Sequence, residues 1–193
     1  MTLRDAAARI REKAESLLAE RGRALIAIDG RCGSGKTTLA AALSEALPCT
    51  VLHMDDFFLR PEQRTEARLA TPGENVDHER FLSEVLTPLR QNEPFAYRPY
   101  DCHRQMLGDP VSVIPGAVTV VEGSYCCHPA LWDAYDLRVF VDTDPEEQLA
   151  RIQKRGGEDA VRAFRERWIP LEEAYFTACN LPQRCHMILQ LQD

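Results

Sequence analysis

Short apolar runs alternate with amphipathic stretches along the chain. The runs are rich in Val, Ile and Leu, have the length of buried strands, and cover residues 24–28, 50–54, 117–122, 137–142 and 186–191. The stretches between them carry apolar residues at helical spacing. Strands that alternate with helices predict an α/β fold, in which helices cover both faces of a parallel sheet. Right-handed crossovers would bring the carboxyl ends of all strands to one edge of this sheet.

Helices are expected where apolar residues recur every three or four positions. The first covers residues 2–23, and its apolar face is formed by Leu3, Ala7, Ile10, Ala14, Leu17 and Leu18. Further helices are expected after the glycine-rich segment and over residues 78–90, 145–155 and 161–178. Proline-containing segments at 60–77 and 94–101 are expected to form a loop or short helix and an edge strand or loop. Because no repeat or interdomain linker is visible, residues 1–193 are predicted to form one domain.

The glycine-rich segment after the first strand has the full P-loop pattern, Gly30-x-x-x-x-Gly35-Lys36-Thr37. Glycines let a phosphate approach the backbone, while the loop amides and the following helix N-terminus attract its charge. Lys36 can reach the β- and γ-phosphates, and the Thr37 hydroxyl can bind Mg²⁺. We therefore predict a site for ATP and Mg²⁺, formed by Gly30, Arg31, Cys32, Gly33, Ser34, Gly35, Lys36, Thr37 and Thr38.

Two strands end in acidic residues that would lie beside this loop. Glu122 ends the strand over 117–122 and is predicted to organise Mg²⁺, together with Thr37 and Asp55. Asp55 follows the strand over 50–54 and is the candidate general base that orients and deprotonates a hydroxyl acceptor. Asp56 is the alternative base, and both aspartates could instead cap a turn.

An arginine-rich segment surrounds the glycine pair at 156–157 and contains Arg151, Arg155, Arg162, Arg165 and Arg167. Guanidinium groups stabilise charge on a transferring phosphoryl group, and closure of such a segment would exclude water. We therefore predict a lid at residues 155–165, with Arg151 and Arg155 in catalysis and Arg162 in nucleotide binding. The alternative is a solvated helix face, in which the arginines pair with acidic residues of the same segment.

Composition and charge limit the classes of binding partner and the compartment that we expect for the protein. The chain has 193 residues and a formal net charge of −7, which argues against a general nucleic-acid surface. No apolar run approaches the roughly 20 residues of a membrane span, and the start of the chain lacks a signal-peptide core. Seven cysteines, an odd number, fit a reducing compartment. We expect a cytoplasmic protein that acts on a small-molecule acceptor, without nucleic-acid or membrane binding; nothing in the sequence indicates an oligomeric state.

Cys32 differs from the other cysteines because it lies inside the P-loop, near a helix N-terminus. This position predicts a lowered thiol pKa and a reactivity that bound ATP would block. The remaining cysteines lack the Cys-x-x-Cys spacing of a zinc site and are expected to be mostly buried thiols.

Together with the P-loop, four motifs resemble the uridine kinase branch of the uridine kinase and phosphoribulokinase family. They are Asp55-Asp56-Phe57-Phe58, Asn75-Val76-Asp77-His78, Tyr100-Asp101 and Glu122-Gly123. The resemblance covers most of the chain from Ala24 onward. It implies a P-loop fold like that of nucleoside monophosphate kinases, three-layered α/β/α with about five parallel strands. It also implies transfer of the γ-phosphate of ATP to a primary hydroxyl, in the type case the 5′-hydroxyl of uridine or cytidine.

The resemblance further implies roles for individual residues. Asp55 matches the catalytic aspartate, Asp77 the acid that holds the ribose hydroxyls, and Tyr100 an aromatic residue beside the base. Glu122 matches the metal-associated glutamate, and the lid arginines match Arg151, Arg155 and Arg162. The residues expected to bind the acceptor are Phe58, Asp77, Tyr100, His103 and Arg104. The chain departs from the family at Cys102, where an aromatic residue is usual, and this departure concerns base recognition.

Two other functions fit parts of the pattern. The acceptor could be another sugar, a vitamin or its riboside. The chain could also be a P-loop NTPase that acts as a switch with a protein partner. No long additional segment is available for such a partner, so the switch ranks last.

Overall fold

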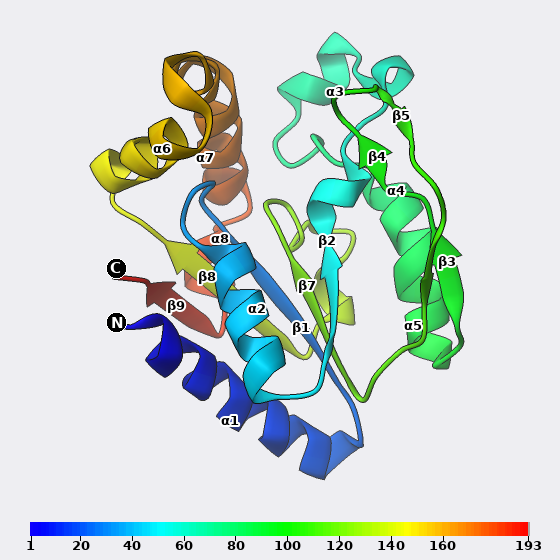
Figure 1. Ribbon diagram of the computed structural model, residues 1–193. Coiled ribbons are helices and arrows are strands. Elements are labelled where there is room, and N and C mark those ends of the chain that lie inside the picture. Colours follow the sequence, from blue (N-terminus) through cyan, green and yellow to red (C-terminus); the bar gives the residue numbers. More distant parts are fainter. Residues whose placement is uncertain (193) are drawn as a thin grey trace.

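A computed structural model describes residues 1–192 of the chain (Figure 1). Its centre is a sheet of five parallel strands in the order β2-β7-β1-β8-β9. These strands are β1 (Ala24–Gly30), β2 (Thr50–His53), β7 (Val118–Glu122), β8 (Leu137–Asp142) and β9 (Met187–Gln190). The predicted parallel core is confirmed, and all five carboxyl ends lie at one edge.

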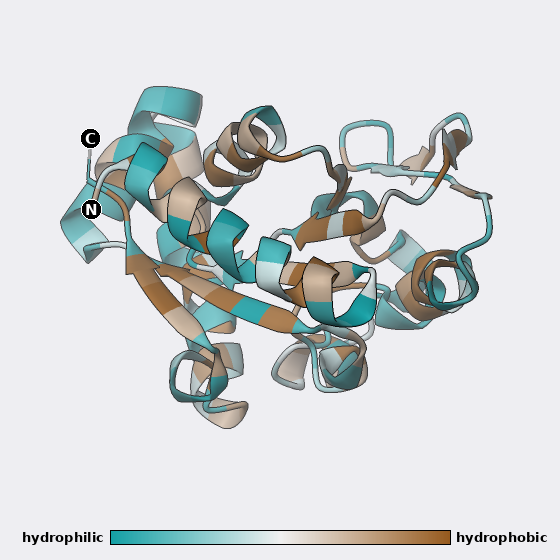
Figure 2. Ribbon diagram, turned by 90° about the horizontal axis from the view of Figure 1, so that it is seen from below, coloured by the Kyte–Doolittle hydropathy of each residue, from teal (hydrophilic) through white to brown (hydrophobic). Residues whose placement is uncertain are grey.

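Helices cover both faces of the sheet. The α-helices of the described residues are α1 (Leu3–Arg21), α2 (Lys36–Ala46), α3 (Glu66–Ala70), α4 (His78–Phe81), α5 (Thr87–Gln91), α6 (Pro145–Ala163), α7 (Ile169–Ala178) and α8 (Leu181–Arg184). Figure 2 shows the apolar colour concentrated on the strands and on the inward sides of the helices. Alternate residues of β1 face different cores: Ile26 and Ile28 pack with α1 and α2, whereas Ala27 packs with the helices of the other face. Burial on both faces explains why the strands are continuous apolar runs, and the three-layer prediction is confirmed.

The first helix, expected over residues 2–23, covers Leu3–Arg21 and has a capping residue at each end. The Thr2 hydroxyl accepts a hydrogen bond from the Asp5 amide at the N-cap. Gly22 adopts a left-handed conformation with φ 73°, and its amide donates to the Leu18 carbonyl oxygen at 2.9 Å. The helix buries Ala6, Ala7, Ile10 and Ala14 against α2 and the sheet.

Two helical segments contain a π-helical turn shortly before a proline. The turn Leu82–Leu86 precedes Pro88, and the turn Phe164–Trp168 precedes Pro170. A proline inside a helix has no N–H to donate, and its ring collides with the carbonyl four residues earlier. A wider turn relieves that collision. The helices predicted over 78–90 and 161–178 are therefore present, with a local change of hydrogen bonding.

The predicted interruption at the glycine pair lies within α6. Gly157 has φ 72° and ψ −168°, which is not helical, and the helix kinks there. The positive φ is readily adopted by glycine and costs other residues free energy. The kink divides the arginine-rich segment at the glycine pair, and movement of this segment as a lid stays a prediction.

Residues 95–113 form two small antiparallel ribbons apart from the main sheet. β3 (Phe95–Tyr97) pairs with β6 (Val111–Val113), and β4 (Tyr100–Asp101) pairs with β5 (Met106–Leu107). Pro99 has no N–H for a ladder, which separates β3 from β4. Figure 1 shows the ribbons beside α3–α5, across the P-loop from α6 and α7. Among the described residues, none of the helices has the length and apolar character needed to cross a membrane.

Candidate active site

The P-loop turns from β1 into α2 at the carboxyl edge of the sheet. Gly30 has φ 135°, and a Cβ placed there would lie 2.1 Å from the Val141 carbonyl oxygen, so a side chain cannot be accommodated. Lys36 Nζ donates to the carbonyl oxygens of Gly30 and Arg31, at 2.8 Å each. The first amides of α2, which begins at Lys36, have no partner within the helix and are available to an anion. The loop therefore has the geometry of a phosphate cradle.

Glu122 lies at the end of β7, beside the first turn of α2. The Thr37 hydroxyl is 3.2 Å from each of its carboxylate oxygens, and His53 Nδ1 is 2.5 Å from Oε1. The hydrogen bond to Glu122 raises the pKa of His53; burial opposes this shift, and the charges of Glu122, Asp56 and Asp55 add to it. Hydroxyl and carboxylate oxygens are the ligands that Mg²⁺ prefers. Thr37 and Glu122 therefore fit the predicted ion.

Of the two adjacent aspartates, only Asp55 is among the residues that line the cavity beside the P-loop. Asp56 instead accepts a hydrogen bond from the Tyr97 hydroxyl at 2.8 Å. The Asp55 side chain is exposed to the open cavity, but protein atoms surround it closely and remove much of its hydration. This desolvation is the main cause that raises its pKa; Glu122 and Asp56 add to the shift, and Lys36 opposes it. A raised pKa makes a carboxylate a better proton acceptor at neutral pH, which favours Asp55 as the candidate base.

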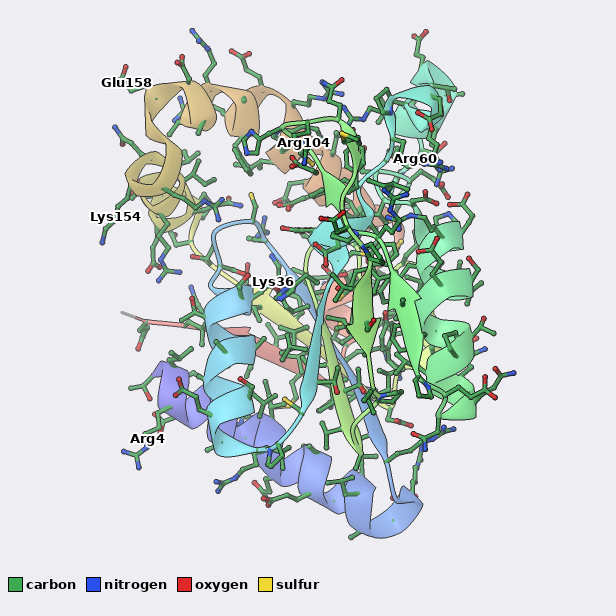
Figure 3. All side chains as sticks on the ribbon, turned by 45° about the vertical axis from the view of Figure 1, so that its right-hand side comes forward. Arg4, Lys36, Arg60, Arg104, Lys154 and Glu158 are labelled. Atoms are coloured by element: carbon green, nitrogen blue, oxygen red, sulfur yellow. The ribbon has the colours of Figure 1, made fainter. Side chains whose placement is uncertain are left out.

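A single cavity of about 1070 Å³ joins the P-loop to the strand-end acids. Its volume exceeds the roughly 300–1,000 Å³ of ordinary ligand pockets, so two small molecules can lie in it together. Twelve of the predicted site residues line it: Cys32, Gly33, Ser34, Gly35, Lys36, Thr37, Thr38, Asp55, Phe58, Glu122, Arg151 and Arg155. Figure 3 shows Lys36 near the middle of the view, with Lys154 and Glu158 above it on one side and Arg60 and Arg104 above it on the other.

Arg31 lies in the P-loop, but its side chain is not among those that line the cavity. Its guanidinium pairs with Asp142 at 2.6 Å and with Glu173 of α7. These contacts connect the P-loop to the end of β8 and to the helix after the lid segment. Participation of the Arg31 side chain in nucleotide binding stays a prediction.

The lid arginines occupy two different environments. Arg151 and Arg155 line the cavity, and Arg151 donates to the Gly33 carbonyl oxygen of the P-loop at 3.3 Å. Arg162 lies beyond the kink, is exposed, and pairs with Asp159 at 2.6 Å. The conformation described here therefore places Arg162 on a solvated helix face, and its role in nucleotide binding stays a prediction.

The far end of the cavity is lined mainly by segments that follow β2. The residues there are Phe58, Leu59, Arg64, Leu69, Asn75 and Cys102. Arg64 donates to the Leu59 carbonyl oxygen at 2.9 Å and to the Tyr100 hydroxyl at 3.3 Å, so its guanidinium is held in place. The Asn75 amide nitrogen donates to the Tyr125 hydroxyl at 3.3 Å. These side chains combine apolar surface with a few polar groups, as small-molecule sites do.

The Asp77 carboxylate has structural partners instead of a place in the cavity wall. It caps α4 by accepting a hydrogen bond from the Arg80 amide at 3.2 Å. It also lies 3.6 Å from the Arg80 guanidinium and 3.8 Å from that of Arg60, and the residue is only 2% exposed. The neighbour Asn75, two positions earlier, reaches the wall. Binding of acceptor hydroxyls by Asp77 stays a prediction.

The other predicted acceptor residues also lie outside the wall. Tyr100 is 4% exposed, and its ring lies beneath the Arg64 guanidinium at 5.7 Å. The amides of His103 and Arg104 donate to the Asp101 carboxylate at 2.8 and 3.0 Å, which makes a tight exposed turn. Cys102, which lies between Asp101 and His103 in the sequence, does line the cavity. The roles of Tyr100, His103 and Arg104 in acceptor binding stay predictions.

Glu172 is a wall residue that sequence patterns did not single out for the site. It comes from α7, is 5% exposed, and accepts hydrogen bonds from the Ser124 hydroxyl at 2.6 Å and the Cys32 amide at 3.0 Å. Ser124 in turn lies 3.4 Å from Lys36 Nζ. One buried carboxylate thus connects the P-loop, the segment after β7 and α7. No short motif could reveal this, because its parts are separated by 48 residues or more.

Asp29 is a second such residue, buried at the end of β1. Its carboxylate accepts hydrogen bonds of 2.7 to 3.1 Å from the amides of Gly30, Tyr125 and Cys127 and from the Tyr175 hydroxyl. Burial raises its pKa to about 6, against the effect of these hydrogen bonds. Asp29 therefore anchors the start of the P-loop to the turn after β7 and to α7.

The predicted activation of Cys32 is wrong. Burial of the thiol raises its pKa to about 12, and the carboxylate of Glu172 adds to the shift. Lys36 acts in the opposite direction and is outweighed. The acid beside the loop comes from a distant helix, so the local sequence gave no sign of it.

Comparisons with known proteins show the family to which the chain is related. A family model described as an AAA domain matches residues 26–169. The uridine kinase of Alkaliphilus metalliredigens (strain QYMF) is 32% identical over 150 residues, which cover 72% of this chain and 71% of that protein. The uridine kinase of Latilactobacillus sakei subsp. sakei (strain 23K) is 30% identical over 150 residues, which cover 72% and 70%.

The fold is also shared with a solved structure. A protein from Bacillus stearothermophilus, described as a possible uridine kinase, superposes with a TM-score of 0.71 at 22% identity, covering 98% of this chain and 100% of that one. Similarity at this identity shows the fold alone, whereas the sequence relatives show the family. The chain belongs to the uridine kinase family of P-loop phosphotransferases.

Proposed function

We propose that this chain transfers the γ-phosphate of ATP, bound with Mg²⁺, to a hydroxyl of a nucleoside, with the 5′-hydroxyl of uridine or cytidine as the first candidate. The observation that carries the proposal is the shared cavity, which has the P-loop on one side, Asp55 and Glu122 at its middle and an apolar-lined space beyond them. The names of the sequence relatives support a nucleoside as the acceptor.

The proposed roles follow from charge and position. Asp55 orients the acceptor hydroxyl and accepts its proton. Lys36, Arg151 and Arg155 stabilise the negative charge that spreads over the transferring phosphoryl group. Thr37 and Glu122 would hold Mg²⁺, which neutralises phosphate charge when bound.

The acceptor would lie between Phe58, Arg64 and Asn75, with Phe58 as apolar contact and the other two as polar contacts. Asp77, Tyr100, His103 and Arg104 remain proposed acceptor residues, since they lie directly behind or beside this part of the wall. Residues 155–165 would act as the lid, moving about the Gly157 kink. We further propose that the protein acts in the cytoplasm as one domain; its seven free cysteines suit a reducing compartment.

The test is phosphate transfer from γ-labelled ATP to a panel of acceptors, with uridine and cytidine beside other ribosides, free sugars and hydroxyl-bearing vitamins. We expect labelled product with a pyrimidine nucleoside and only slow hydrolysis without an acceptor. Labelling of a sugar or vitamin alone would contradict the nucleoside assignment. Hydrolysis that no small acceptor affects would contradict the kinase itself.

A further inference from the structure

The cavity continues past the P-loop to a wall formed by the beginning of α1 and the segment after β9. The residues that line it there are Thr2, Leu3, Arg4, Leu191 and Gln192. Figure 1 shows the start of α1 close to β9 on this side of the sheet. No motif in the sequence indicated that these two segments meet at the site.

Backbone hydrogen bonds fix this wall in place. The Met1 amino group donates to the Gln190 carbonyl oxygen at 2.8 Å, and the Gln192 amide donates to the Met1 carbonyl oxygen at 3.0 Å. Leu191 is 6% exposed, and its Cδ1 lies 3.1 Å from the position of a Cβ built on Gly35. The wall therefore touches the P-loop directly.

The orientation of a triphosphate in the P-loop determines which part of it lies near this wall and which part lies near the acceptor. Lys36 and the Thr37 hydroxyl serve the β- and γ-phosphates and their metal. Thr37 contacts Glu122, on the side of the cavity where Asp55 lies, whereas Gly35 contacts Leu191. A triphosphate whose terminal phosphate points toward Asp55 must extend its nucleoside in the other direction, along Gly35 and toward Leu191.

We propose that Leu3, Arg4, Leu191 and Gln192 bind the nucleoside half of the triphosphate donor. The inference rests on the proposed function in one respect, namely that the P-loop binds a nucleoside triphosphate. Leu3 and Leu191 belong to the same apolar cluster and offer surface to the flat face of a base. The exposed Arg4 guanidinium can stack on a planar ring, and the Gln192 amide can donate to and accept from its edge.

The test compares a ligand that has a base with one that has none. Calorimetric titrations of the full chain with Mg-ATP and with Mg-tripolyphosphate measure the two affinities. Leu3→Gln alters the wall, and Leu17→Gln is its matched control, because Leu17 is half-buried on the same helix against the same core but outside the cavity. We expect Leu3→Gln to weaken ATP about tenfold and tripolyphosphate by less than about twofold, with both affinities unchanged in Leu17→Gln.

A second pair of variants, at exposed positions, keeps the test valid if Leu3→Gln fails to fold. Arg4→Gln changes an exposed residue, and Arg9→Gln removes the same charge from an exposed position of α1 outside the cavity. We expect Arg4→Gln alone to weaken ATP more than tripolyphosphate. ATP affinity unchanged in both wall variants, or an equal loss for the two ligands, would overturn the inference and leave the proposed function intact. Absence of ATP binding by the unaltered chain would overturn both.

Discussion

The two ends of the large cavity are built in different ways. At the phosphate end, the groups come from one continuous loop and from the ends of neighbouring strands, and they bond to each other: Thr37 to Glu122, and Lys36 to two carbonyl oxygens of its own loop. At the acceptor end, single side chains such as Phe58, Arg64 and Asn75 come from irregular segments.

This difference separates the residues that bind and transfer phosphate from the residues that select the acceptor. Phosphate binding depends on backbone geometry that a short motif encodes, whereas acceptor binding depends on where packed loops direct individual side chains. Substitutions at the phosphate end should therefore lower turnover for every acceptor. Substitutions at the acceptor end should change the Michaelis constant of the acceptor and leave that of ATP unaltered.

The largest effect is expected for Asp55→Asn. A carboxamide cannot take the acceptor proton, so kcat should fall by about 10²–10⁴, while ATP affinity measured by calorimetry persists. Asp56→Asn is the matched control and should retain most of the turnover, because Asp56 contacts Tyr97 and does not line the cavity. Wild-type turnover in Asp55→Asn would remove Asp55 from the role of base.

A smaller effect is expected for Glu122→Gln, which keeps the shape but removes the charge beside Thr37. The Mg²⁺ concentration for half-maximal rate should rise by about 10- to 100-fold. Asp142→Asn is the control, since Asp142 ends the neighbouring strand β8 but pairs with Arg31 away from the cavity. The same Mg²⁺ dependence in wild type and Glu122→Gln would exclude Glu122 from the metal site.

At the acceptor end, Arg64→Ala should raise the acceptor Michaelis constant by about tenfold and leave kcat and the Michaelis constant of ATP nearly unchanged. Loss of one charged hydrogen bond to the acceptor is the reason. Arg90→Ala is the control, because this arginine is exposed on α5 and does not line the cavity. An increase in both Michaelis constants would mean that the two ends of the cavity are not separate.

The smallest effect concerns the protonation of His53. Its hydrogen bond to Glu122 raises the pKa in the folded chain above the usual value of about 6.5. The stability that the protonated pair contributes is therefore complete below about pH 6.5 and is lost as the pH rises through the folded pKa. Because the side chain is 44% exposed, solvent screening should keep this contribution below about 1 kcal/mol. Titration by NMR should show the raised pKa in wild type and a lower one in Glu122→Gln; equal values would contradict the pairing.

The parallel sheet, the P-loop and the acids at the edge of the sheet could all be predicted from the amino-acid sequence. These features depend on local rules: apolar runs make buried strands, glycines permit the loop conformation, and parallel strands bring Asp55 and Glu122 to one edge. The interruption of the helix at Gly157 could be predicted for the same reason, since glycine readily adopts its positive φ.

The contacts between side chains of distant segments could be seen only in the folded chain. Burial of the Cys32 thiol raises its pKa against the expectation, and Glu172, 140 residues away, adds to the shift. Asp77 caps a helix, whereas Asn75 reaches the cavity wall. The contact between the start of α1 and the segment after β9 is of the same kind. Such contacts depend on the packing of whole helices against the sheet, and side-chain burial and electrostatic environment depend on the sum of those neighbours, which no short stretch of sequence contains.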